Sequence, residues 1–468
     1  MATKIRREID KKTAELKITV PVAADVWKKE QKLAFDKLAK KVKVPGFRPG
    51  KAPEKELRKR VALTNIWEEA IGKLLNVAII DAAKEIKESD IVLHRPTYVI
   101  DKVTEEELEI TYIYPVFPEL KIKNYKTLKV QFKEATKKDI QADVEEQIDK
   151  MLLRGSLLLP KEGKNAKVEK GDTITFDFKG FIKDKAFDGG EAEGYELLIG
   201  SNTFIPGFED QLIGKSLGWK GNINVKFPAN YYKEDFQNQD ARFEIKINEI
   251  KYNDKPKLDE QFIKSLNIPD VSNKEQLNTY LYNLSEKELA EKARVNFMDE
   301  LLIKVINENE IPVPKVIALE EMNNLLKKFR DNLKQQDISE KEYYEVTGYN
   351  EQKVKDELLT EATKTVKKSL LETFFIKDLD IKPTDEDYLR QYQRMAKLYN
   401  IDGKEIQKMI KKEIIEPQIV KELMIDKLIV SNNPKVKIKK EKVEIELVSE
   451  AEIKEHEEKL NHKNSVEN

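Results

Sequence analysis

Apolar residues along the first 130 positions follow two different periods. Residues 16–20 alternate as a strand does, whereas two longer stretches place apolar side chains every three or four positions, as a helix does. The predicted elements are, in chain order, a strand over 16–20 that Pro21 ends, helices over 23–42 and 65–87, a hairpin of strands over 97–103 and 108–114, and a helix over 136–153. On the second helix, the side predicted to be buried carries Ile66, Ala70, Leu74, Val77, Ala78 and Ile80. This mixture predicts an α+β N-terminal domain.

The pattern changes between residues 166 and 252. Ten of the 17 glycines and 14 of the 37 aromatic residues fall there, and short runs alternate at 172–178 and 241–247. Glycine marks turns, and alternation between turns is typical of strands. This segment predicts a small β domain.

From residue 256 onward the helical period dominates. The predicted helices are 273–308, 315–335, 351–377, 385–398 and 403–431, with breaks at Pro269, Pro312, Pro314, Pro383 and Gly403. Pro417 lies inside the last helix and predicts a kink there. Residues 435–448 alternate weakly, which favours a strand, and the charged tail over 449–468 is predicted to be disordered.

Composition narrows the classes of function. The 468 residues suggest three domains at about 150 residues each, and the charged fraction of 37% favours an extended shape over a single sphere. The absence of cysteine excludes disulfides, thiol nucleophiles and cysteine-ligated metals. The three histidines, His94, His456 and His462, are spread along the chain, which argues against histidine-based hydrolysis and His-rich metal sites. No stretch approaches 18 apolar residues and no signal peptide is recognisable, so we expect a cytoplasmic protein without a membrane partner.

Charge is concentrated in one place. The formal net charge is -1, yet residues 28–60 contain 13 Lys or Arg and 4 Asp or Glu, a local net charge of +9. Within that segment, residues 44–53 hold three prolines and two glycines, which fix a stiff turn that displays Phe47, Arg48 and Lys51. Two interpretations stay open from these residues alone: a solvated helix–loop–helix tip, or a surface that docks onto an anionic partner such as phosphate groups.

A second motif lies inside the β domain. Residues 199–214 read as a turn rich in Gly and Pro that leads into a short helix, and Phe227, Pro228 and Tyr231 follow. Core packing is the ordinary role of each aromatic residue here. The number of aromatic residues nevertheless exceeds what so small a core can enclose. Some of them are therefore predicted to line a concave apolar site.

The basic loop resembles a family signature. Gly46, Phe47, Arg48, Lys51 and Pro53 match G-F-R-x-x-K-x-P, the ribosome-docking signature of the trigger factor family, and the surrounding strand–helix–loop–helix order is similar too. The resemblance implies that Phe47, Arg48 and Lys51 contact the large ribosomal subunit at the tunnel exit, touching both ribosomal RNA and a ribosomal protein.

Residues 166–252 resemble the FKBP-type peptidyl-prolyl isomerases, which form an insertion in that family. The similar stretches are 178–180, 187–190, 205–208 and 227–231. The resemblance implies a proline pocket lined by Phe178, Phe187, Asp188, Phe204, Ile205, Phe208, Phe227, Tyr231 and Phe243. Phe208 stands where many single-domain relatives have tryptophan, so tight macrolide binding is not expected. Asp188 has two open roles: a polar contact at the pocket, or a turn cap before Gly189 and Gly190.

Isomerisation of an X–Pro bond requires no reactive group in such a pocket. Rotation about an X–Pro amide crosses a barrier of roughly 18–20 kcal/mol. Because the twisted transition state loses amide resonance, it is less polar than either planar isomer, and an apolar cavity that excludes water favours it. We therefore expect no nucleophile, metal or other cofactor.

The helical remainder carries apolar stripes, such as Met322, Leu325, Leu326 and Phe329, and, elsewhere, Leu277, Leu281, Leu284, Leu301, Leu302 and Val305. Packing within the chain is the favoured interpretation for most of them, and a partly exposed cradle for unfolded chains is the alternative. By the resemblance, residues 131–164 join 253–448 in one discontinuous helical domain.

The expected fold is multidomain α+β. It comprises an α+β ribosome-binding domain over 1–130, an FKBP-like β domain with a short helix over 165–252, the elongated all-α chaperone domain over 131–164 and 253–448, and the tail over 449–468. The expected function is that of a ribosome-associated chaperone that binds nascent or unfolded polypeptides and isomerises X–Pro bonds. Its action is expected to be independent of ATP, since the sequence has no G-x-x-x-x-G-K-[ST] phosphate-binding loop. The alternative is a free prolyl isomerase without ribosome docking. A third interpretation is a ribosome- or RNA-associated factor whose isomerase pocket is vestigial. Homodimerisation off the ribosome stays open.

Overall fold

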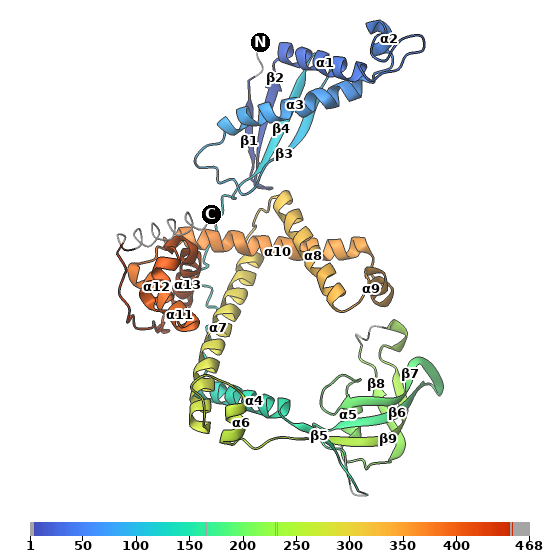
Figure 1. Ribbon diagram of the computed structural model, residues 1–468, viewed down its shortest axis with the longest axis vertical. Helices are drawn as coiled ribbons and strands as arrows, with labels where there is room; N and C mark the ends of the chain where they lie inside the picture. The colour runs from blue at the N-terminus through green and yellow to red at the C-terminus, as the bar shows by residue number, and fades with distance from the viewer. Residues whose placement is uncertain (1–3, 164–165, 230, 232, 450–451, 453–468) are drawn as a thin grey trace, which may run out of the picture. The chain divides into compact units, whose positions relative to one another are not determined.

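The computed structural model describes residues 4–163, 166–229, 231, 233–449 and 452 (Figure 1). Contacts divide the chain into two compact units, one of residues 1–132 with 296–468 and one of residues 133–295. Helix α7 (Lys274–Glu308) runs through the boundary between them. Within the described residues, every helix is too short or too polar to cross a lipid bilayer.

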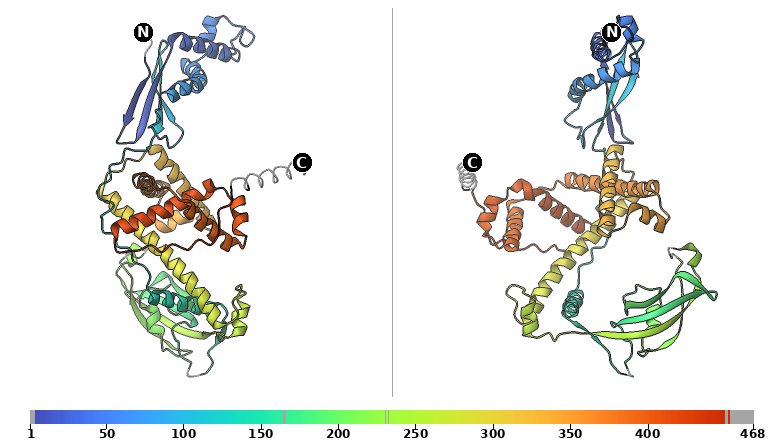
Figure 2. Two further views of the ribbon diagram at one scale, coloured as in Figure 1. Left: turned by 90° about the vertical axis from the view of Figure 1, so that its left-hand side faces the viewer. Right: turned by 45° about the vertical axis from the view of Figure 1, so that its right-hand side comes forward.

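An antiparallel sheet forms the N-terminal part of the first unit. Its strands lie in the order β1 (Arg6–Asp10), β2 (Glu15–Val22), β4 (Leu108–Pro115) and β3 (Thr97–Val103). Helix α3 (Leu63–Lys84) packs against one face of the sheet and α1 (Ala24–Ala39) packs against α3, with the short α2 (Glu54–Arg58) between them in sequence (Figures 1 and 2). Both long helices and the hairpin confirm the predictions for this region.

Two predicted details of the N-terminal region are wrong. Strand β2 continues through Pro21 to Val22. Its ladder with β1 ends at Thr19, so Pro21 lies in a stretch with a free edge, where proline is tolerated. On α3, Val77 and Ile80 are each 59% exposed, because the buried face follows every fourth residue. That face is formed by Ile66, Ala70, Leu74, Ala78 and Ala82.

Helices make up the rest of the first unit. They are the second part of α7, α8 (Lys315–Gln335), α9 (Glu340–Thr347), α10 (Glu351–Asp378), α11 (Asp385–Tyr399), α12 (Gly403–Met409) and α13 (Lys412–Asn432). Residues 117–132 cross this helical region and contribute Tyr125 and Val130 to its core. The side-chain amides of Asn432 and Asn433 hold that crossing segment by donating to the carbonyls of Tyr125 (3.1 Å) and Val130 (2.9 Å).

The helix predicted over 403–431 is two helices. Ile410 has an extended backbone, and the interruption at Ile410 and Lys411 precedes Pro417, which lies inside α13. The hydroxyl of Tyr392 donates to the Ile410 carbonyl (2.8 Å), so a side chain from α11 satisfies a backbone group that helix continuation would otherwise use. The break therefore coincides with a tertiary contact from α11. The kink predicted at Pro417, which lies inside α13, stays a prediction.

The strand favoured over 435–448 is not formed either. These residues have no strand partner in the part of the chain that the structure describes. The predicted disordered tail over 449–468 lies, apart from Ser449 and Glu452, outside the described residues. Several short elements had no counterpart in the sequence predictions, among them β1, β5 (Leu157–Pro160), α6 (Glu260–Ser265) and α9.

The second unit contains the β domain. The sheet has the order β5, β9 (Asp240–Asp254), β6 (Thr173–Ile182) and β7 (Lys185–Leu198), and β8 (Lys220–Lys226) also pairs with β9. The predicted short helix is α5 (Phe208–Leu212). Helix α4 (Lys137–Arg154), α6 and the start of α7 form a small separate core from Val144, Ile263, Leu277 and Leu281.

Candidate functional site

The aromatic residues predicted for the pocket come together. They are delivered by separate elements: Phe178 by β6, Phe187 by β7, Phe208 by α5, Phe243 by β9, and Phe204, Ile205, Phe227 and Tyr231 by the intervening loops. Ring centroids lie 5.3 Å apart for Phe208 and Phe243, 4.3 Å for Phe204 and Phe208, and 4.6 Å for Phe227 and Tyr231. Phe187 links the two ends, at 6.0 Å from both Phe227 and Phe243.

Burial separates this cluster into a floor and a rim. Phe208, Phe227 and Phe243 are buried in the core of the β domain, and Phe178 is nearly so. Phe187, Phe204, Ile205 and Tyr231 are only half-buried. The buried side chains are called the floor and the half-buried ones the rim; that they line a proline pocket stays a prediction.

Two glycines make room for the Phe187 ring. A Cβ atom on Gly180 would lie 2.7 Å from the Phe187 ring, and one on Gly190 would lie 2.6 Å from it. Both distances are well below van der Waals contact. The ring is therefore seated between two backbone segments that only glycine allows to approach so closely.

Sequence reasoning missed several members of the cluster. Phe236 lies 5.1 Å from Phe187 and 5.4 Å from Phe227, and Phe176 and Tyr195 contact Phe178. Their aromatic character was the available signal, but no motif singled them out. Asp188 lies within β7, and its side chain is outside what the structure describes.

A buried carboxylate holds the loop that precedes α5. Glu209 accepts backbone N–H bonds from Gly200 (2.7 Å), Thr203 (3.0 Å) and Phe204 (3.3 Å), and also from Asn202 (3.2 Å). Burial alone would raise the pKa of Glu209, but these backbone donors outweigh it and the pKa is lowered. The carboxylate thus fixes the loop that carries Phe204.

We expect Glu209→Gln to loosen that loop. The new amide NH₂ would face backbone donors, so about 1–3 kcal/mol of local stability should be lost. Hydrogen exchange of the backbone amides of residues 200–204 would be at least fivefold faster than in the unmodified chain. Asp210→Asn, at the exposed neighbouring carboxylate, is the control. Equal protection in Glu209→Gln and the control would contradict this role.

The second candidate site is the basic loop. Gly46 (φ +85°) and Gly50 (φ +72°) adopt left-handed backbone conformations, and Pro53 is the N-cap of α2. The Gly50 N–H donates to the Val42 carbonyl (3.1 Å), which closes the loop. Phe47 is 48% exposed, and Arg48 and Lys51 are exposed as well. Neither basic side chain forms a salt bridge with any residue that the structure describes. The loop therefore exposes one aromatic ring and two cations at the surface of the N-terminal region.

No group of three or more His, Asp or Glu side chains within the described residues is arranged to hold a metal ion. The favoured interpretation of the helical stripes is confirmed for most positions: Leu277, Leu281, Leu301, Leu302, Val305, Met322 and Leu326 are all buried.

Fold and sites together define a chain in which an FKBP-type domain is inserted into a larger helical protein. The family model for FKBP-type peptidyl-prolyl cis-trans isomerase matches residues 164–248. Two models for bacterial trigger factor protein match residues 3–151 and, for its C-terminus, 275–430.

Curated relatives cover nearly the whole chain. The trigger factor of Mycoplasma mobile is 36% identical over 427 residues, covering 91% of this chain and 88% of its own. That of Mesomycoplasma hyopneumoniae strain J is 36% identical over 471 residues, covering 99% and 100%. A solved structure from work on promiscuous substrate recognition by the trigger factor chaperone is 17% identical with a TM-score of 0.39, covering 92% and 99%.

The chain belongs to the trigger factor family. It is a chaperone with a ribosome-binding N-terminal domain and an FKBP-type peptidyl-prolyl isomerase domain.

Proposed function

We propose that this chaperone docks on the large ribosomal subunit at the tunnel exit through Gly46, Phe47, Arg48, Lys51 and Pro53. There it binds nascent polypeptides without ATP and isomerises their X–Pro bonds. The observation that carries the docking proposal is the stiff loop that presents an exposed aromatic ring beside two cations. Arg48 and Lys51 would contact ribosomal RNA phosphates, and Phe47 would pack against an apolar part of a ribosomal protein.

The aromatic cluster supports the isomerase step. The proline ring of a substrate would contact the half-buried Phe187, Phe204, Ile205 and Tyr231, which exclude water from the twisting amide. The buried Phe208 and Phe243 would form the floor beneath them. Phe178 and Phe227 would pack behind the floor. Asp188 would either make a polar contact at the pocket or cap the turn before Gly189 and Gly190. No residue in this arrangement has to transfer a proton or form a covalent bond, which suits a reaction that only rotates a C–N bond.

Exposed apolar side chains support the binding of nascent chains. Leu398, Tyr399, Met409 and Ile414 lie at the ends of α11 and α12 and the start of α13, and each is more than half exposed. Exposed residues of this kind are suited to transient contact with unfolded segments.

The proposal also includes the domain boundaries at 1–130, 165–252 and 131–164 with 253–448. It further includes a cytoplasmic location and homodimerisation off the ribosome. Packing of α4 against α6 and α7 supports joining residues 131–164 to the later helices.

Co-sedimentation with ribosomes through a sucrose cushion at moderate salt tests the docking. We expect the intact chain to pellet with ribosomes and the Phe47→Ala, Arg48→Ala, Lys51→Ala variant to stay in the supernatant. A matched control is Lys29→Ala, Lys32→Ala, Leu33→Ala on α1, which removes the same charge and one exposed apolar side chain. If the control detaches equally, net charge and not the loop governs binding. If the intact chain does not pellet, the free prolyl isomerase is the better interpretation.

A further inference from the structure

The segment that follows α13 is held by two glutamine side chains. Gln393 of α11 donates its amide N–H to the Lys442 carbonyl (2.9 Å) and accepts from the Glu444 N–H (2.7 Å). Gln407 of α12 repeats this arrangement four residues later. It donates to the Glu446 carbonyl (3.0 Å) and accepts from the Val448 N–H (3.0 Å).

Both amides reproduce the hydrogen-bonding pattern of a β-strand. In a parallel pair, one residue bonds the carbonyl of position i−1 and the N–H of position i+1 on its neighbour. Gln393 does so around Val443 and Gln407 does so around Leu447. Recognition of this kind reads the main chain, so it is independent of the side-chain sequence, as in peptides that add a strand to a sheet edge.

Side-chain contacts add two shallow apolar anchors. Ile445 packs against Gly403, where a Cβ would lie 2.9 Å from the isoleucine Cγ2, and Val448 is buried. Between these anchors, Glu446 and Leu447 are exposed. Any extended chain with branched apolar residues at these two positions would meet the same contacts.

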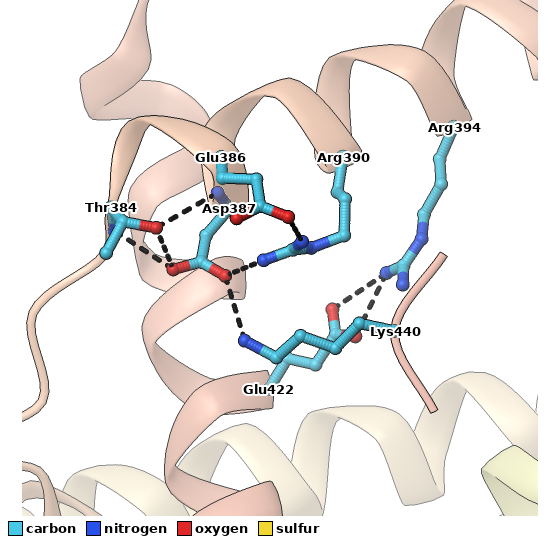
Figure 3. A network of polar contacts seen from close by, with 7 residues as sticks. All are labelled: Thr384, Glu386, Asp387, Arg390, Arg394, Glu422 and Lys440. Carbon is cyan, nitrogen blue, oxygen red and sulfur yellow. Dashed lines mark hydrogen bonds and ion pairs between the residues drawn. The ribbon is translucent and has the colours of Figure 1, made fainter. Parts of the chain in front are cut away.

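Two ion pairs hold the start of this segment. Lys440 reaches Asp387 (3.3 Å; Figure 3), and the Nε of Arg394 lies 3.4 Å from a carboxylate oxygen of Glu441. Surface pairs of this sort are individually weak. The segment is therefore retained by a few main-chain bonds, two apolar contacts and two ion pairs, and by its covalent attachment, which gives it a high effective concentration.

We propose that the surface of α11 and α12 around Gln393, Gly403 and Gln407 is a binding site for extended polypeptide segments, which residues 441–448 occupy within the free chain. The ligand is an extended client segment with two branched apolar side chains, bound through its backbone by Gln393 and Gln407. Its binding displaces residues 441–448. This inference rests on the proposed chaperone function, since it assigns one site for unfolded clients.

A disulfide that locks residues 441–448 in place tests the displacement. The chain has no cysteine, and a Cβ on Gly403 would lie 3.4 Å from the Ile445 Cβ, close to the ~3.5–4.5 Å of disulfides. The probe is a fluorescein-labelled peptide with the sequence of residues 440–449, measured by anisotropy. We expect full-length Gly403→Cys, Ile445→Cys to bind it at least tenfold more weakly when oxidised than when reduced. Equal binding in both states would overturn the proposal.

Two further comparisons test backbone recognition. A peptide with N-methyl groups at the positions of Glu444 and Val448 lacks both donors and should lose binding to the reduced protein at least tenfold. Gln393→Leu with Gln407→Leu should lose it as well, whereas Gln418→Leu, at an exposed glutamine of α13, should not. Undiminished binding of the methylated peptide would overturn the assignment.

These outcomes are separable from those of the proposed function. Ribosome co-sedimentation and prolyl isomerisation should be the same for the oxidised and reduced forms, because neither uses this surface of α11 and α12. Loss of ribosome binding in the unmodified chain would refute the docking and leave the peptide result standing.

Discussion

Replacing Phe187 by alanine is expected to lower kcat/KM for isomerisation of a short prolyl peptide at least tenfold in the full-length chain. The ring lies at the rim, in contact with Phe227, Phe236 and Phe243. Its removal admits water beside the twisting amide, so the transition state loses the apolar surroundings that favour it over the planar isomers. Isomerisation followed by NMR exchange or a protease-coupled assay provides the measurement.

Phe181→Ala is the matched control for that prediction. Phe181, on β6, is also a half-buried phenylalanine of the hairpin that β6 forms with β7. Its ring lies outside the aromatic cluster and packs under Arg242, whose Cζ is 4.6 Å from the ring centroid. Its truncation should leave turnover within about twofold. Unchanged turnover in folded Phe187→Ala, or an equal loss in both variants, would contradict the pocket assignment.

Burial changes how Phe208 should be tested. The sequence motif suggests Phe208→Ala as a variant that loses activity and stays folded. The structure places Phe208 entirely within the core, where truncation of phenylalanine to alanine costs about 3–5 kcal/mol. Phe208→Leu keeps most of the volume and removes the ring, so it is the more informative substitution.

The long helices were predictable because their signals are local. The period of apolar residues and the prolines at their ends placed α7, α8, α10 and α11 within a residue or two. The interruption at Ile410 was not predictable, because the group that stabilises it is the hydroxyl of Tyr392, 18 residues away in sequence. Residues 435–448 misled for the same reason: alternation indicates an extended chain, but whether a strand or two glutamine side chains bind its backbone depends on tertiary contacts.

The candidate sites divide in the same way. Phe47, Arg48 and Lys51 stand in one stiff loop, so their display follows from neighbouring Pro and Gly residues. The pocket aromatics could be named only through the family resemblance, since they come from separate strands and loops. Glu209 escaped notice because a glutamate in a short helix looks ordinary until the N–H groups around it are known.

Low pH should weaken the packing of α11, because the buried carboxylate of Asp387 caps the N-terminus of this helix. Thr384 donates to it through its backbone N–H (3.0 Å) and its hydroxyl (2.7 Å), and Arg390 and Lys440 bond its other oxygen (Figure 3). Burial alone would raise the pKa of Asp387, but these donors and cations outweigh it and hold the pKa well below its ordinary value.

The sign of the pH dependence follows from that shift. The folded-state pKa lies below the unfolded value of about 3.9, so the ionised carboxylate stabilises the fold above roughly pH 4. This stabilisation is lost as the pH falls from there toward the folded-state pKa. We therefore expect the amides of α11 and α12 to lose hydrogen-exchange protection between about pH 4 and pH 2.

Asp387→Asn should show the same effect at neutral pH. Breaking a buried ion pair by neutralising one partner costs about 3–5 kcal/mol. The asparagine retains some of the capping bonds, so the local stability of α11 should fall by about 3 kcal/mol, or roughly a hundredfold in exchange protection. Glu386→Gln is the control, because Glu386 pairs with the same Arg390 but its side chain is 67% exposed, and exposed pairs contribute less than about 1 kcal/mol. If Asp387→Asn and Glu386→Gln lose equal hydrogen-exchange protection in α11, exposed charge pairing with Arg390 stabilises the helix. That outcome would contradict the role given to the buried carboxylate. If Asp387→Asn alone is affected, and its remaining protection no longer falls below pH 4, the buried carboxylate is the group that titrates.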